Sequence, residues 1–86
     1  MEYKRFGDTY LVRLEKGEEI LTSLTRLAEK EDIHLASVSG LGAINSFTAG
    51  VFFPEEKVYR KNDFHGNFEI TSLTGTITQM DGKPYL

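Results

Sequence analysis

The sequence predicts an α+β fold, in which a mainly antiparallel sheet carries one principal helix packed on it. Three observations lead to this prediction: one stretch has helical periodicity, several apolar runs have strand periodicity, and short turn signals separate those runs. Strands that return through short turns pair antiparallel, and a helix with one apolar stripe buries it against a sheet. At 86 residues, 40% of them hydrophobic, the chain suits a single domain over residues 1–86 with a modest core.

The chain opens with a predicted β-hairpin. Residues 3–6 and 9–15 are strand candidates, and Gly7-Asp8 between them is a turn signal. Tyr10, Val12 and Leu14 fall on one face of the second strand, because side chains alternate along a strand. This face is the one that we expect to be buried.

Residues 18–31 are the one strong helix prediction. Gly17 is the expected N-cap, and Glu18 and Glu19 suit the positive end of the helix dipole. Packing of the apolar stripe on the sheet is the expected use of this helix, and a partner-binding amphipathic helix is the alternative. The stripe consists of Ile20, Leu21, Leu24, Leu27 and Ala28.

The middle of the chain predicts a strand at 33–39, a break or bend at Gly40-Leu41-Gly42, and a second strand at 47–53. The second strand has apolar residues on both faces, which indicates a central strand or one covered by another subunit. Residues 55–62 are charged and are expected to form a short edge strand or a loop.

A long strand over residues 67–80 follows, with an irregularity inside it. Phe68 and Ile70 have one parity, whereas Leu73 and Ile77 have the other, so a regular strand cannot place all four on one face. We expect a bulge or bend near residues 71–72, and a close backbone approach at Gly75.

Asp81-Gly82 is a tight hairpin signal, and residues 83–86 begin the return strand. The long strand therefore lacks most of its expected partner, and an open edge of this kind invites pairing with another chain. We expect residues 1–86 to lack the C-terminal strands of the domain. The alternative is that another strand of the same sheet covers the edge.

Charge and composition limit the classes of function. The formal net charge of −3 and the scattered basic residues argue against autonomous DNA binding. No cysteine is available for thiolate metal binding or disulfides, which fits a reducing cytoplasm. No apolar run is long enough to span a membrane, so we expect a cytoplasmic protein without membrane association.

No catalytic constellation stands out, so these residues give no support for an enzyme. Gly40-Leu41-Gly42 lacks both the third glycine and the following helix of a dinucleotide-binding loop. His34 and His65 are the only histidines, and Glu69 and Asp63 are the conceivable carboxylate donors beside them. His34 is expected where the helix passes into a strand, and His65 in a turn before Gly66. Their spacing does not require a metal site, so capping or loop histidines are the simpler interpretation.

Three ordered segments carry a family resemblance. Residues 13–20 (RLEKGEEI), residues 36–45 (ASVSGLGAIN) and residues 66–75 (GNFEITSLTG) together resemble the plants-and-prokaryotes-conserved domain, which occurs with AT-hooks in plant nuclear proteins. The resemblance extends over the whole chain. It implies a largely antiparallel α/β domain and a homotrimer. No basic AT-hook occurs in this sequence, so the resemblance does not extend to the DNA-binding segment of the plant proteins.

The resemblance also implies a partner-binding segment. In plant members the matching stretch helps to bind other nuclear proteins. The resemblance therefore implies a partner-binding site in this chain that consists of Gly66, Asn67, Phe68, Glu69, Ile70 and Thr71. Asn67 and Thr71 differ from the plant pattern, which has arginine and an aliphatic residue there.

Three functional hypotheses follow. The first is an oligomeric module that acts by self-assembly and partner contact, and a second, placed below it, is DNA-associated regulation. The alternative is a metal-dependent enzyme or small-ligand binder. Prokaryotic members of the family carry further histidines beyond the stretch that matches residue 86. The metal ligands that this alternative needs, for instance for zinc, would lie there.

Overall fold

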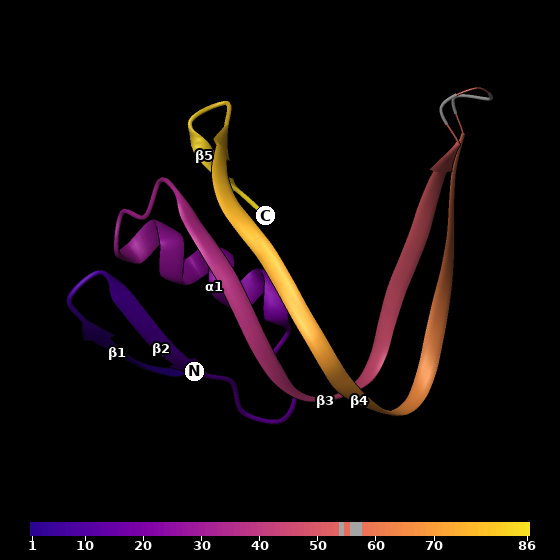
Figure 1. Cartoon of the computed structure of the whole chain (residues 1–86), viewed down its shortest axis with the longest axis horizontal. Coiled ribbons are helices and arrows are strands. Elements are labelled where there is room, and N and C mark those ends of the chain that lie inside the picture. Colours follow the sequence, from indigo (N-terminus) through magenta and orange to yellow (C-terminus); the bar gives the residue numbers. More distant parts are fainter. Residues whose placement is uncertain (54, 56–57) are drawn as a thin grey trace. The chain divides into compact units, whose positions relative to one another are not determined.

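The computed structural model describes residues 1–53, 55 and 58–86, with side chains at 1–47, 55 and 61–86. Strands β1 and β2 form a two-stranded sheet, and β3, β4 and β5 form a three-stranded sheet in that order. Within the described residues, one helix and mainly antiparallel strands confirm the α+β class (Figure 1). The elements are β1 (Glu2–Phe6), β2 (Thr9–Arg13), α1 (Ile20–Lys30), β3 (Ala36–Phe53), β4 (Val58–Met80) and β5 (Lys83–Tyr85).

The chain divides into two compact units. The first contains residues Met1–Val38 and Gly75–Leu86, and the second contains Ser39–Thr74. The first unit therefore holds the N-terminal hairpin, the helix and the β4–β5 turn. The second unit holds most of β3 and β4.

The predicted N-terminal hairpin is confirmed. β1 and β2 pair antiparallel, with Tyr3 opposite Val12 and Arg5 opposite Tyr10, and Gly7 takes a φ of 59° in the turn. Tyr3, Tyr10 and Val12 are half-buried on one face, whereas the residues between them are exposed. The strand ends at Arg13, two residues earlier than expected.

The start of the helix corrects the prediction. α1 begins at Ile20, and its N-cap is Glu19, whose carboxylate accepts a hydrogen bond from the backbone N–H of Thr22. Gly17 is not the cap. It lies two residues further upstream with a φ of 94°, in a turn that only glycine enters easily.

The buried stripe of α1 is narrower than predicted. Leu27 and Ala28 are 3% and 1% exposed, and Ile20 and Leu24 are half-buried. Leu21 is 56% exposed, so its assignment to the stripe was wrong. At 100° per residue Leu21 lies at the stripe's edge, whereas Ser23 is in line with Ile20 and Leu27 and is buried in its place.

The helix ends in a hydrogen-bonded turn that delays the next strand. The backbone N–H of Ile33 donates to the carbonyl of Ala28 at 2.9 Å, while Asp32 takes a φ of 55°. This is a Schellman-type closure with aspartate where glycine is usual. Because the turn uses Ile33, the strand predicted at 33–39 begins only at Ala36.

Of the break or bend predicted at Gly40-Leu41-Gly42, the break is absent, and so is a turn at His65. β3 continues through Gly40-Leu41-Gly42, with Gly42 at a φ of 143°. His65 lies inside β4 and not in a turn, because Gly66 reaches a φ of 148° without ending the strand. β4 starts at Val58, so residues 58–62 of the segment predicted as an edge strand or a loop form strand, and residues 54 and 56–57 lie outside the described chain.

The parity change within β4 is confirmed by its exposure pattern. Phe68 and Ile70 are half-buried, Thr71 and Ser72 are both exposed, and Leu73 resumes the half-buried pattern on the other parity. The predicted close approach occurs at a different glycine. A Cβ on Gly75 would meet nothing within 4 Å, whereas a Cβ on Gly40 would lie 3.2 Å from Leu73 Cδ2.

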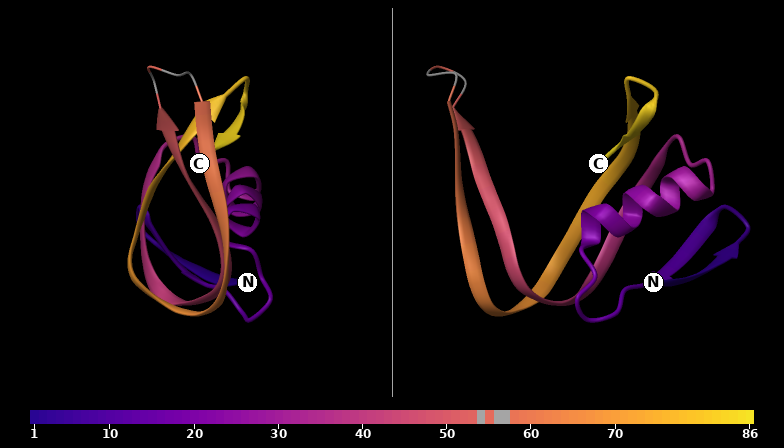
Figure 2. Two further views of the ribbon diagram at one scale, coloured as in Figure 1. Left: turned by 90° about the vertical axis from the view of Figure 1, so that its right-hand side faces the viewer. Right: turned by 180° about the vertical axis from the view of Figure 1, so that it is seen from behind.

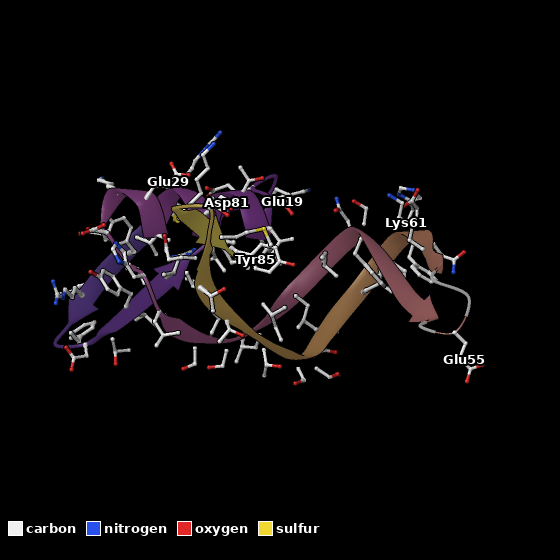
Figure 3. All side chains as sticks on the ribbon, turned by 90° about the horizontal axis from the view of Figure 1, so that it is seen from above. Glu19, Glu29, Glu55, Lys61, Asp81 and Tyr85 are labelled. Atoms are coloured by element: carbon white, nitrogen blue, oxygen red, sulfur yellow. The ribbon has the colours of Figure 1, made fainter. Side chains whose placement is uncertain are left out.

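The last hairpin is confirmed at Asp81-Gly82. Their φ values of 54° and 77° are both positive, as a two-residue type I′ turn requires. β5 pairs with Thr78–Met80, so the return strand covers a three-residue stretch of β4. It also contacts α1, and Tyr85 lies beside that helix (Figure 3).

Candidate functional site

Three phenylalanines form a cluster in the second unit. The ring of Phe47, from β3, stacks on that of Phe64 with centroids 5.0 Å apart and meets that of Phe68 edge-on at 5.2 Å. Both geometries are favourable for aromatic pairs. Phe47 and Phe64 remain 37% and 41% exposed, so the cluster forms an apolar face that is not buried within the described chain.

The predicted partner-binding segment shares this face in part. Phe64, Phe68 and Ile70 have the same parity on β4, and Phe68 and Ile70 are half-buried. Asn67, Glu69 and Thr71 are exposed on the other parity, and Gly66 is exposed as well. The segment therefore presents an apolar side and a polar side.

The sequence analysis did not single out Phe64, nor the contact between the rings of Phe47 and Phe64. Phe64 stands two residues before Gly66 and four before Phe68, which is the spacing of one strand face, but a turn was expected around His65. The two-sided apolar strand predicted at 47–53 can be followed only at Phe47, because the side chains of 48–53 lie outside the described ones.

The second unit has no buried side chain among those described. The buried residues of the described chain are Ser23, Leu27, Ala28 and Ile77, and all four belong to the first unit. A β-hairpin without a buried face is only marginally stable in water. Figure 3 shows Lys61 of this unit near the far end of its hairpin, beyond which Glu55 is exposed.

The first unit carries a polar pair next to the end of α1. His34 Nε2 and Asp32 Oδ1 are 2.7 Å apart, with side chains 67% and 87% exposed. Two shallow hollows, of about 200 and 390 Å³, adjoin the pair, one beside β5 and one beside the N-terminal hairpin. A polar contact this exposed contributes little to stability, because water competes for both side chains.

The histidines and carboxylates predicted as conceivable metal ligands do not assemble into a site. His34 belongs to the first unit, whereas Asp63, His65 and Glu69 all lie on β4 in the second. Among the described residues, no group of three or more potential ligands comes together. These residues alone therefore do not fit a metal centre, and the metal-dependent alternative needs other ligands.

Glu18 ties the start of the chain to the segment before the helix. Its Oε1 lies 2.6 Å from the N-terminal nitrogen of Met1 and accepts a hydrogen bond from the backbone N–H of Glu15 at 2.8 Å. The bond from the N-terminal ammonium, and then that from Glu15, lower the pKa of the Glu18 carboxyl. The hydrogen bond from the backbone N–H of Thr22 likewise lowers the pKa of Glu19.

We expect a Glu18→Gln variant to change how stability depends on pH. A carboxyl whose pKa is lowered on folding stabilises the fold above its ordinary pKa, which is 4.5 for Glu18, and this contribution is lost as the pH falls through the lower folded value. The variant should be less stable than the parent chain at pH 7, and the difference should vanish in acid. Urea unfolding between pH 7 and pH 3 measures this.

Glu29→Gln provides the matched control, because it removes the same charge from an exposed position of α1. A difference between parent and Glu18→Gln that stays constant down to pH 3 would contradict the assignment.

Within the described chain, no helix is both long and apolar enough to cross a bilayer.

The chain was compared with known proteins. It matches the Plants and Prokaryotes Conserved (PCC) domain over residues 1–86. No curated protein matches it. Among solved structures, a "putative DNA-binding protein" from Bacteroides thetaiotaomicron is 33% identical with a TM-score of 0.93, over 98% of this chain and 59% of that one.

Two archaeal structures are also similar. A plant- and prokaryote-conserved (PPC) protein from Pyrococcus horikoshii is 34% identical with a TM-score of 0.84, over 98% of this chain and 57% of that one. A metal-containing protein from Archaeoglobus fulgidus is 32% identical with a TM-score of 0.82, over 86% of this chain and 53% of that one. The chain thus spans between about half and three fifths of the length of these structures.

The family match over the full chain agrees with the resemblance of the three sequence segments, and the fold agrees with the solved structures. The chain belongs to the Plants and Prokaryotes Conserved (PCC) domain family.

Proposed function

We propose that this chain is a self-assembling module, with a homotrimer as the expected form, that acts through contacts between its copies and with partner proteins. The observation that carries the proposal is the partly exposed aromatic face of Phe47, Phe64 and Phe68. Large apolar side chains grouped on a surface favour burial against another molecule. A second copy of the chain supplies an identical face.

The exposure of the described side chains in the second unit supports the same proposal. None of its described side chains is buried, whereas the first unit has its own buried residues. Burial of apolar surface is the main favourable term in folding and association, and each Å² removed from water contributes about 25 cal/mol. Assembly would therefore stabilise the unit that gains least from intramolecular packing.

Within this proposal, the partner-binding segment is Gly66, Asn67, Phe68, Glu69, Ile70 and Thr71. Phe68 and Ile70 would contribute to the contact between copies, because they share the parity of Phe64. Asn67, Glu69 and Thr71 lie on the opposite parity and would remain available to a different protein.

Light scattering coupled to size-exclusion chromatography tests the proposal. The parent chain should have the mass of an oligomer at micromolar concentration, and Phe64→Glu should reduce it to that of a monomer, because burial of a charge in an apolar contact is costly. His65→Glu is the matched control, since it introduces a carboxylate one residue away on the other parity and should leave the mass unchanged. A monomeric parent chain would overturn the proposal.

DNA association is the second candidate function. Two solved structures that resemble the chain, from B. thetaiotaomicron and Ralstonia eutropha, are described as putative DNA-binding proteins. The net charge of −3 means that such binding would be weak and would depend on local charge. Fluorescence anisotropy with a labelled duplex at 20–200 mM salt tests it, and no binding even at the lowest salt would remove this candidate.

We also propose that α1 packs on the three-stranded sheet. Leu27 and Ala28 of the helix and Ile77 of β4 are its buried apolar residues, and the contact between α1 and β5 supports this arrangement.

A further inference from the structure

The turn between β4 and β5 joins an aspartate directly to a glycine. Asp81 and Gly82 are both exposed at the tip of this hairpin (Figure 2, yellow), and Figure 3 labels Asp81 there. Such a pair is open to ring closure, because glycine has no side chain to hinder attack of its backbone nitrogen on the aspartate side chain. The other three aspartates of the sequence precede bulkier residues, in the pairs Asp8-Thr9, Asp32-Ile33 and Asp63-Phe64.

The ring closure needs only water and a base from the solution. The backbone nitrogen of Gly82 loses its proton and bonds to Cγ of Asp81, and one carboxyl oxygen leaves as water. The product is a five-membered succinimide. Water then adds to one of the two ring carbonyls and breaks its bond to the nitrogen. Opening at the former main-chain carbonyl leaves the chain connected through Cγ, which is an isoaspartate of unchanged mass.

The folded turn keeps the reacting atoms apart. The φ values of 54° at Asp81 and 77° at Gly82 are those of a type I′ turn, whose first central residue has a ψ of about 30°. At this ψ the backbone nitrogen of Gly82 lies roughly opposite Cβ of Asp81 across the Cα–C bond, so Cγ cannot reach it. Isoaspartate formation therefore requires the turn to open.

The hairpin beyond the turn is held by few contacts. β5 pairs with Thr78–Met80 of β4, and the Thr78 hydroxyl donates to the Tyr85 carbonyl at 3.4 Å. β5 also contacts α1, and Pro84 is its half-buried residue. Elements with so few contacts open at a lower free energy than the buried core does. β5 can therefore leave β4 while the residues around Leu27 stay packed.

We propose that Asp81-Gly82 is a modification site at which isoaspartate forms when β5 leaves β4, and that the product then keeps the hairpin open. Isoaspartate adds one methylene to the main chain, and the type I′ turn has exactly two central residues whose length sets the register of the hairpin. The pair Met80–Lys83 beside the turn is lost, and the contact of β5 with α1 is lost with it. The site belongs to the first unit and is independent of the proposed self-assembly.

Incubation of the parent chain at neutral pH tests the site. Isoaspartate accepts a labelled methyl group from an isoaspartyl methyltransferase, and it resists an endoproteinase that cuts before aspartate. We expect cleavage before Asp81 to be lost with time at unchanged mass, whereas cleavage persists before Asp8, Asp32 and Asp63. Equal losses at all four aspartates, or no methyl incorporation, would contradict the assignment.

Asp81→Glu is the matched control for the chemistry. It keeps the negative charge, but attack by the Gly82 nitrogen would have to close a six-membered ring, which forms far more slowly. This variant should incorporate no methyl group over the same time. Incorporation equal to that of the parent chain would place the modification elsewhere, and circular dichroism confirms that the variant is folded.

A second incubation, in urea, measures how far the folded turn suppresses the reaction. The unfolded chain should form isoaspartate several-fold faster than the folded chain. Pro84→Gly, which removes the half-buried ring from β5, should speed the reaction in the folded chain. Lys16→Gly introduces the same residue at an exposed position of the first unit and should react at the parent rate. Equal rates in folded and unfolded chains would show that opening of the hairpin is not required.

Hydrogen exchange tests the consequence of the modification. After chromatographic separation, the backbone amides of β5 in the modified chain should exchange faster than those of the parent chain, whereas the amides of α1 around Leu27 should be unchanged. Unchanged exchange in β5 would mean that the turn absorbs the extra methylene, and would overturn the claim that the hairpin stays open.

Discussion

Replacing Leu27 by alanine is expected to lower the free energy of unfolding by about 2–5 kcal/mol. Leu27 is 3% exposed and is one of three buried apolar residues in the described chain, with Ala28 and Ile77. The substitution removes apolar surface and leaves a cavity that neighbouring side chains can fill only in part. A domain of this length has roughly 4–13 kcal/mol of total stability, so the loss is a large share.

Urea unfolding followed by circular dichroism measures the effect of Leu27→Ala. Leu21→Ala is the matched control, because the same substitution is made in the same helix at a side chain that is 56% exposed. The control should cost well under half as much. Equal losses for the two variants would show that the buried stripe of α1 has been assigned to the wrong residues.

Gly40→Val is expected to destabilise the chain by about 1–3 kcal/mol. A Cβ at this position would lie 3.2 Å from Leu73 Cδ2, closer than ordinary van der Waals contact, so the Leu73 side chain has to shift to make room. The backbone at Gly40 does not take a positive φ, so the cost comes from packing and not from backbone strain. Valine is otherwise favoured in strands, which makes a loss of stability diagnostic.

Two further variants isolate this contact. Gly75→Val is the control, since a Cβ there meets nothing within 4 Å, and it should be neutral or slightly stabilising. Adding Leu73→Ala to Gly40→Val should recover part of the loss, and a double-mutant cycle measures the coupling of the two positions. Additive effects would contradict direct contact between Gly40 and Leu73.

The two units differ in how they are stabilised. In the first, buried Leu27, Ala28 and Ile77 provide a small core. In the second, the described side chains provide an aromatic face around Phe47 that stays partly exposed. Disruption of this core should therefore unfold the chain, whereas disruption of the aromatic face should mainly change its assembly.

Sequence patterns were reliable where local rules act alone. The turns at Gly7 and at Asp81-Gly82 are where the residue types predict them, because positive φ values restrict the choice of residue. The parity change between Ile70 and Leu73 was also readable, since alternation along a strand depends only on residue order.

Predictions failed at glycines, which occur in several kinds of backbone structure, and at the helix N-cap, where another side chain took the predicted role. Gly17 was expected to cap the helix, but Glu19 does so because its carboxylate reaches the N–H of Thr22. Gly42 was expected at a break or a bend and Gly66 directly after a turn, but both lie within long strands that accommodate their positive φ values. Glycine identity alone does not distinguish these outcomes.

The sequence by itself determined the α+β class, the order of the main elements, the two tight turns and the membership of a domain family, because these depend on local periodicity, turn chemistry and residue order. Only the tertiary structure decided that Phe47, Phe64 and Phe68 come together, that Leu73 packs at Gly40 and that Leu21 remains exposed. These contacts depend on which strand registers and helix faces meet in space, and such pairings between residues far apart in the chain leave no local pattern.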